Sequence, residues 1–292
     1  MTAQGRIERR FAELRRNRDC GLVAFLTAAD PTPAVCAKLL DALVAGGADM
    51  IELGMPFSDP MADGPAIQAS SLRALKAGGG MNTTLQLARE FRQRHPDTPL
   101  ILMGYYNPVH KTGAEKFAGR AKDAGADGLI IVDLPPEEED ELRRYTDAAG
   151  LSWTRMMTPA SDARRRKTLL AKKSAFIYYV AIKGITGTRT ANLAELRGEL
   201  RNLARETELP VAVGFGLRTP ADLAEIRDDA DAVVVGSALV EEIANAVSDN
   251  GGDGDSDGDG DGDGDSDALA EKLRGKVSEL KAALNKTKET VP

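Results

Sequence analysis

The chain alternates between short apolar runs rich in β-branched residues and longer segments with helical periodicity. The apolar runs lie at 21–27, 48–54, 99–105, 126–133, 151–157, 174–180, 209–215 and 231–237. Between them, apolar residues recur at i, i+3 and i+4, as in 34–44, 85–91, 142–149 and 193–203. A nearly apolar strand followed by an amphipathic helix is typical of a parallel sheet that helices cover. The pattern therefore predicts eight successive β–α units.

Eight such units match the (β/α)8 barrel, or TIM barrel, which takes ~250 residues. We therefore predict this α/β fold, with a helix at 4–16 that caps the bottom of the barrel. An open doubly wound sheet is the alternative that the pattern leaves. The predicted organisation is a barrel at 1–248, an acidic Asp/Gly-rich flexible insertion at 249–267, and a C-terminal helix packing back on the barrel at 268–292.

The negative charge of the chain belongs to one segment. The 292 residues carry a net charge of −7, but 249–267 holds nine aspartates and no basic residue, which leaves 36 acids against 38 bases elsewhere. The acidic run fits parts of calcium-loop patterns, yet it lacks their apolar positions and final glutamate, so a solvated linker is the simpler interpretation. A nearly neutral remainder argues against nucleic-acid binding, which needs a clustered basic face.

Composition excludes several other classes of protein. An apolar content of 42% with 28% charged residues is ordinary for a globular chain. No apolar run approaches the ~20 residues that span a bilayer, so no membrane contact is expected. Cys20 and Cys36 cannot form a disulfide framework and predict reduced, buried thiols in a cytoplasmic protein. Walker, zinc-protease and C-x-x-C motifs are absent from the sequence, and no metal site is expected.

Two carboxyl groups are the strongest candidates for chemistry. Glu52 ends an otherwise apolar run, so on a barrel it would face the lumen or its rim, where partial burial raises the pKa of an acid. Asp63 follows on a loop stiffened by Pro and Gly that could return over the barrel mouth. Two carboxyls in different surroundings can divide acid and base roles. The alternative is that Glu52 is a salt-bridged rim residue and Asp63 a turn former.

Glycines at three neighbouring strand ends are the second candidate site. They are Gly184–Gly187, Gly214–Gly216 and Gly236–Ser237, the last before a helical run. Glycine lets backbone N–H groups approach an anion, and a helix N-terminus carries roughly +0.5 charge. Barrels often hold phosphate after strands seven and eight, so we predict a phosphate site here, although each glycine could simply turn the chain.

These residues lie in segments that resemble the tryptophan synthase alpha chain family. The most specific is IELGMPFSDPMADGPAIQ at 51–68, which is similar to the family signature around its catalytic glutamate. Supporting segments are AFLTAADP (24–31), LMGYYNP (102–108), GITG (184–187), VGFGL (213–217) and VVVGSALV (233–240). The resemblance covers roughly 5–247 and about 268–286, and the aspartate run is an insertion between these parts.

The resemblance implies a lyase that cleaves indole-3-glycerol phosphate to indole and glyceraldehyde 3-phosphate. It implies that Glu52 protonates the indole C3 carbon and that Asp63 accepts a hydrogen bond from the indole N–H. Thr186 would orient Asp63 when the loop after the sixth strand closes. The residues implied to line the indole pocket are Phe25, Tyr105, Tyr178 and Phe215, and those implied to hold the phosphate are Gly187, Gly216, Gly236 and Ser237.

The resemblance also implies a partner. Indole would pass to a pyridoxal-phosphate beta chain in an alpha2beta2 heterotetramer and be condensed with serine to tryptophan, while this chain would need no cofactor of its own. Two alternatives stay open. Indole-3-glycerol-phosphate synthase would need a catalytic lysine inside a strand end, which none of the eight runs offers. A catalytically idle barrel would bind a beta chain without cleaving substrate.

Overall fold

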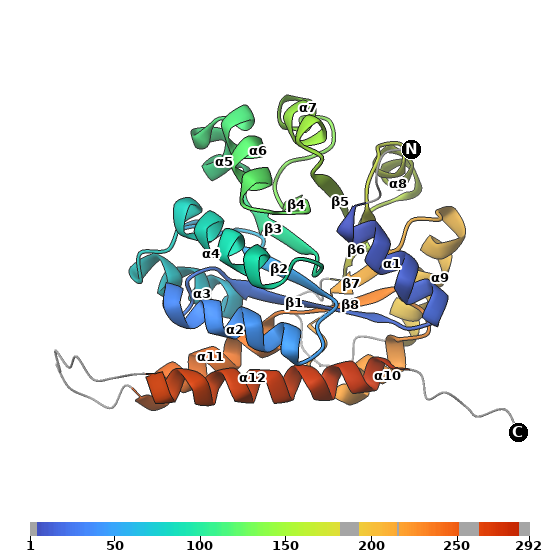
Figure 1. Ribbon diagram of the computed structural model, residues 1–292. Coiled ribbons are helices and arrows are strands. Elements are labelled where there is room, and N and C mark those ends of the chain that lie inside the picture. The colour runs from blue at the N-terminus through green and yellow to red at the C-terminus, as the bar shows by residue number, and fades with distance from the viewer. Residues whose placement is uncertain (1–4, 182–192, 215, 251–262, 286–292) are drawn as a thin grey trace, which may run out of the picture.

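The computed structural model is a closed barrel of eight parallel strands surrounded by helices (Figure 1). It describes residues 5–181, 193–214, 216–250 and 263–285. The strands are β1 (Gly21–Thr27), β2 (Met50–Gly54), β3 (Leu100–Gly104), β4 (Gly128–Ile131), β5 (Ser152–Met157), β6 (Phe176–Val180), β7 (Val211–Gly214) and β8 (Ala232–Val235). Each strand lies within one of the eight predicted runs, and β8 pairs with β1. The predicted (β/α)8 barrel is confirmed, and the open sheet is excluded.

The helices follow the strands in chain order. They are α1 (Arg6–Asn17), α2 (Pro33–Ala45), α3 (Pro65–Lys76), α4 (Met81–Arg94), α5 (Tyr106–Thr112), α6 (Ala114–Asp123), α7 (Asp140–Ala149), α8 (Ala163–Leu170), α9 (Leu193–Glu206), α10 (Pro220–Ile226), α11 (Ser237–Asn250) and α12 (Asp263–Leu284). Helix α3 begins at Pro65, so the loop after β2 that carries Asp63 spans residues 55–64.

Helix α1 closes the bottom of the barrel, as the sequence predicts. Its apolar residues Ile7, Phe11 and Leu14 lie on one face and are buried. They pack with lumen residues of several strands, and the ring of Phe11 lies 5.3 Å from that of Phe176, centroid to centroid. Side chains therefore fill the lower lumen, and any substrate cavity must lie at the opposite end, where the strands end.

Alternation along the strands decides which residues face that cavity. Met50 lies in the apolar cluster that fills the lower lumen. Because successive side chains of a strand point to opposite faces, Glu52 also points into the lumen, one layer higher. The pairing of Phe25 with Glu52 in the β1–β2 register places these two side chains in the same layer. Glu52 thus places a carboxyl group at a lumen position where an apolar side chain would normally pack.

Helix α12 lies along α2 and α10 and joins the C-terminal segment to the barrel (Figure 1). Its buried stripe is Leu269, Leu273, Val277, Leu280 and Leu284. Gly46, at the end of α2, permits the close crossing, because a Cβ atom there would lie 2.7 Å from the carbonyl oxygen of Arg274. Lys281 Nζ also contacts Asp49 Oδ2 at 2.6 Å.

The start of α12 differs from the sequence-based prediction. The helix begins at Asp263, within the segment predicted to be a flexible insertion, rather than at 268. Lys38 Nζ lies 2.9 Å from Ser266 Oγ and 2.8 Å from Asp267 Oδ1, which ties the first turn to α2. Acidic residues are also favourable at a helix N-terminus. Composition alone does not indicate this early start of the helix, because Lys38 lies more than 200 residues away in the sequence.

Both cysteines are buried and neither forms a disulfide bond, as expected. Across the described parts of the chain, no helix is long and apolar enough to cross a membrane.

Removing a buried side chain of α12 tests how far this helix supports the barrel. We expect Leu273→Ala to lower the free energy of unfolding by about 2–5 kcal/mol, because Leu273 is fully buried and truncation leaves a cavity. Denaturant unfolding measures this loss. Glu279→Ala, at an exposed position of the same helix, is the control and should change stability by less than about 0.5 kcal/mol. Equal effects of the two substitutions would show that α12 does not contribute to the folded core.

Candidate active site

Glu52 lies at the centre of the upper lumen. Its side chain is 1% exposed, and its Oε1 atom has no hydrogen-bond partner within the described residues. Burial raises the pKa of Glu52 to about 8, and the negative charge of Asp63 contributes in the same direction. Glu52 is therefore mostly protonated at neutral pH. The alternative of a salt-bridged rim residue does not hold in this structure.

Asp63 reaches the same cavity from the loop after β2. Burial raises the pKa of its carboxyl, while a hydrogen bond from the Tyr105 hydroxyl opposes that rise. The backbone N–H of Ala62 donates to the Tyr105 hydroxyl at 3.1 Å. Tyr105 therefore fixes the loop at two adjacent residues, and it holds Asp63 close enough to Glu52 for the two carboxyls to affect each other.

The two carboxyls open into a cavity of about 570 Å³ at the top of the barrel. The predicted site residues that line it are Phe25, Glu52, Asp63, Tyr178, Gly216, Gly236 and Ser237. Tyr105 lines a small neighbouring cavity with Phe25 and Asp63. Thr186, Gly187 and Phe215 lie outside the described residues. The structure thus brings together eight of the eleven residues that the sequence singles out.

One side of the cavity is apolar. Its side chains include Ile67 and the inward-facing residues Met103 (β3), Val132 (after β4) and Met156 (β5). Sequence reasoning missed these residues because apolar residues in a strand are ordinary core material. Alternation along the strands could have found Met103, Val132 and Met156, because each lies two residues after a residue that faces the lumen. This wall suits a flat aromatic ring that presents a polar edge to Asp63.

The opposite side of the cavity is formed by the ends of β7 and β8. Gly216 has φ +64°, and a Cβ atom there would meet nothing within 4 Å, so its backbone is open to a ligand. Helix α11 begins at Ser237, and its first N–H groups have no acceptor within the helix. Among the described residues that line the cavity, none is Lys or Arg. Backbone amides and the helix dipole are what this end offers to an anion.

Two glycines at this end have a further role that the sequence did not indicate. A Cβ atom at Gly214 would lie 2.6 Å from the Tyr178 ring, and one at Gly236 would lie 3.2 Å from the Phe25 ring. Gly214 therefore makes room for an aromatic wall rather than for phosphate. Gly236 serves the Phe25 ring and also precedes α11.

No cluster of three or more His, Cys, Asp or Glu that could hold a metal ion occurs in the described part of the chain.

The raised pKa of Glu52 makes a prediction about stability. Between about pH 4.5 and about pH 8 the folded protein keeps a proton on Glu52 that the unfolded chain releases, so this group's contribution to the free energy of unfolding falls as pH rises through that window. Glu52→Gln cannot titrate. We expect its stability relative to the natural sequence to increase from about pH 5 to about pH 8 in urea unfolding. Glu279→Gln, at an exposed position, is the control. A constant difference across this range for Glu52→Gln would contradict the prediction.

Comparisons with known proteins agree with this geometry. The family model described as tryptophan synthase alpha chain matches residues 11–255. Tryptophan synthase subunit alpha from Legionella pneumophila str. Paris is 35% identical, with a TM-score of 0.84 over 97% of this chain and 99% of that chain. A tryptophan synthase complex from Pyrococcus furiosus is 34% identical, with a TM-score of 0.75 over 90% of this chain and 98% of that one. Tryptophan synthase from Mycobacterium tuberculosis is 29% identical, with a TM-score of 0.81 over 97% and 99%.

The matched residues 11–255 contain all eight strands, both carboxyls and the start of α11. The chain therefore belongs to the tryptophan synthase alpha chain family and is a lyase that cleaves indole-3-glycerol phosphate to indole and glyceraldehyde 3-phosphate.

Proposed function

We propose that Glu52 is the general acid of this cleavage and that Asp63 stabilises the charge that develops on the indole ring. The observation that carries the proposal is the buried Glu52 carboxyl, which faces the cavity without an ionic partner and holds its proton at neutral pH. A general acid works best when its pKa lies near the working pH. Asp63 differs from Glu52 because it lies on a half-buried loop and accepts a hydrogen bond from Tyr105.

The reaction breaks the bond between C3 of the indole ring and the hydroxyl-bearing carbon of the glycerol chain. Glu52 donates its proton to C3, and the ring nitrogen becomes positively charged. The Asp63 carboxylate accepts the hydrogen bond of the ring N–H and stabilises that charge. The electron pair of the broken bond returns to the ring, and the alcohol becomes the aldehyde. Its hydroxyl proton passes to the Glu52 carboxylate, which restores the protonated acid.

The substrate lies with its ring among the aromatic and apolar residues and its phosphate at the glycine end. Phe25, Tyr105 and Tyr178 contact the ring, and Tyr178 also lies near the glycerol chain. The amides of Gly216, Gly236 and Ser237 hold the phosphate at the start of α11. Binding of the remote phosphate orients the ring against Glu52. From the family resemblance we assign Phe215 to the ring, Gly187 to the phosphate and Thr186 to the orientation of Asp63.

The activity of a Glu52 variant tests this assignment. We expect Glu52→Gln to lower kcat/KM for indole release by about 10²–10⁴-fold, because the amide cannot donate a proton to carbon. The activity of the natural sequence should fall as pH rises through about 8, where Glu52 loses its proton. Asp63→Asn should move this fall to lower pH, because it removes a negative charge that raises the pKa of Glu52.

Glu279→Gln is the control for this experiment, since that residue lies on the exposed face of α12. Indole release by Glu52→Gln at the rate of the natural sequence would exclude Glu52 as the acid. If the protein with its natural sequence binds a beta chain but releases no indole, the alternative of a catalytically idle barrel is correct.

We further propose that the chain works with a tryptophan synthase beta chain as an alpha2beta2 heterotetramer in the cytoplasm. Indole would pass to the beta chain, whose pyridoxal phosphate serves the condensation with L-serine, and this chain would use no cofactor. Among the similar structures, that from Pyrococcus furiosus is a tryptophan synthase complex and that from Mycobacterium tuberculosis is a tryptophan synthase. The exposed apolar side chain of Met61, 82% accessible on the loop that carries Asp63, is a candidate contact at the cavity mouth.

A charge at the cavity mouth tests the partner. We expect Met61→Lys to weaken binding to the beta chain by about tenfold or more, because an apolar anchor would be replaced by a charge. Sedimentation velocity with a titrated beta chain measures the affinity. Val247→Lys, an exposed apolar position on α11, is the matched control and should bind normally. Equal affinities for both variants would remove Met61 from the interface, and no complex with the natural sequence would contradict the heterotetramer.

A further inference from the structure

We infer that a second pocket adjoins the ring end of the cavity and accepts an uncharged substituent on the six-membered ring of the indole, with Met156 as the partition between them. This inference rests on the proposed function, because it takes the ring to lie between Asp63 and β5. We call this second space the β4–β5 pocket. It is bounded by β4, β5, residues 133–136 and α8, and it has a volume of about 340 Å³.

The pocket exists because two neighbouring strands of the barrel separate early. The β3–β4 and β5–β6 pairs each hold four residue pairs, whereas within the described strands β4 and β5 are paired only at Gly128–Ser152 and Leu129–Trp153. Continued register would place Val132 opposite Met156, but these residues are not paired. The barrel wall is therefore open at the level of the active-site cavity, between the ends of these two strands.

The β4–β5 pocket and the active-site cavity share the side chains that separate them. Val132 and Met156 line both spaces. Both residues pack against the lumen cluster, whereas Trp153 of the same strand packs in the core outside the barrel sheet. Methionine is unbranched and flexible, so it can move without disturbing the strand. Met156 can therefore admit a group from the cavity into the pocket.

The orientation of the ring points its far edge at this partition. The ring nitrogen lies at Asp63 and C3 lies at Glu52, which sit at the β2 and β3 side of the cavity. The C5 and C6 edge then extends along Met103 toward Val132 and Met156. A substituent at C5 or C6 would meet Met156 first and the pocket behind it next.

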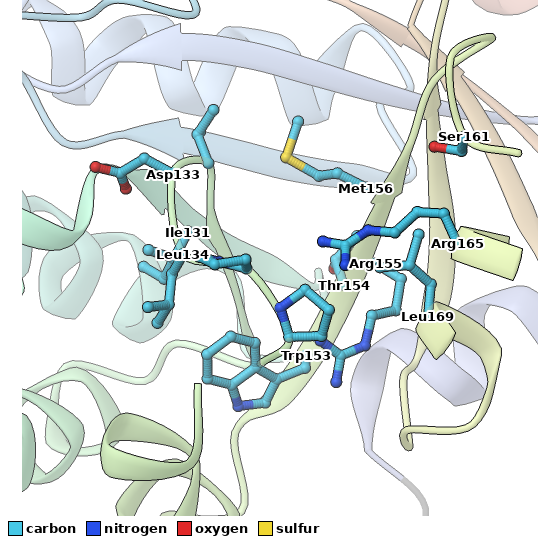
Figure 2. Close-up of a pocket in the computed structure, with 13 residues that line it drawn as sticks. Ile131, Asp133, Leu134, Trp153, Thr154, Arg155, Met156, Ser161, Arg165 and Leu169 are labelled. Atoms are coloured by element: carbon cyan, nitrogen blue, oxygen red, sulfur yellow. The ribbon is translucent and has the colours of Figure 1, made fainter. Parts of the chain in front are cut away.

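The chemistry of the pocket indicates an uncharged substituent. Its charged residues already have partners: Arg155 forms two contacts with the buried Glu139, Arg165 pairs with Glu137, and Asp133 accepts from the backbone N–H of Tyr106 at 2.7 Å. Apolar surface comes from Leu134, Trp153 and Leu169 (Figure 2). A methyl or chloro group would gain apolar contact here, whereas a charged group would lose its hydration, and an anion would find both arginines already paired with glutamates.

Ring-substituted indoles test the inference in the synthetic direction. Indole, 5-methylindole and 6-methylindole are each supplied with glyceraldehyde 3-phosphate, and the ratio of kcat/KM for a methylindole to that for indole is measured. For the natural sequence, we expect kcat/KM for the better methylindole to lie within about tenfold of kcat/KM for indole. Met156→Ala should raise that ratio by about tenfold, because it widens the entrance.

Two further variants separate the pocket from general effects. Val234→Ala enlarges the same cavity from β8, away from the β4–β5 pocket and from the C5 and C6 edge of the ring, and should leave the ratio unchanged. Leu169→Phe fills the pocket from α8, and it should lower the ratio while the activity on indole itself stays the same. Thermal melting confirms that each variant folds.

The inference is overturned if Met156→Ala and Val234→Ala change the ratio alike, or if Met156→Ala leaves it unchanged. Failure of the proposed function looks different, since Glu52→Gln would then release indole at the rate of the natural sequence.

Discussion

A carboxyl group buried without an ionic partner is the constraint around which the upper barrel is built. Transfer of a charged carboxylate into such a place is unfavourable, so Glu52 keeps its proton, and the protein holds an acid where its surroundings are mostly apolar. The lower lumen makes this possible, because α1 and the lumen side chains exclude water from below. Asp63 strengthens the effect from the loop side. One desolvated group thus connects the packing of the barrel bottom with the chemistry at its top.

The aromatic walls around Glu52 depend on missing side chains elsewhere. The Phe25 ring lies against Gly54 and the Tyr178 ring against Gly214 at separations that leave no room for a Cβ atom, and a Cβ atom at Gly236 would require a small shift of the Phe25 ring. Gly54 in β2 and Gly236 after β8 lie on the two sides of the Phe25 ring, and Gly214 in β7 lies beside the Tyr178 ring. These glycines therefore leave the space that the two aromatic rings occupy, in addition to any turn that the chain makes there. Glycines at strand ends consequently mean different things in one site: Gly216 leaves open space, whereas Gly214 is filled by a neighbour.

The strand pattern and the two carboxyls could be predicted from the sequence because they follow local rules. Alternation within 48–54 places Glu52 in the lumen once a barrel is assumed, and the eight apolar runs indicate the barrel. Three features could not be predicted in this way. The early start of α12 depends on Lys38, the separation of β4 from β5 on pairing between strands, and the role of Gly214 on Tyr178. Each is a contact between distant residues, which composition and periodicity do not record.

The opening between β4 and β5 shows that these two strands are held together differently at the bottom and at the top of the barrel. Near the bottom, Gly128 and Leu129 keep full pairing with β5, and the closed sheet supports the core. Toward the top, the segment after β4 turns away and is held instead by the buried Glu139, which binds Arg143 and Arg155. A buried carboxylate with several cationic partners replaces strand pairing as the fixed point of this segment. Because such a support lies outside the lumen, the inner wall is left to Val132 and Met156, and their side chains alone set the shape of the cavity there.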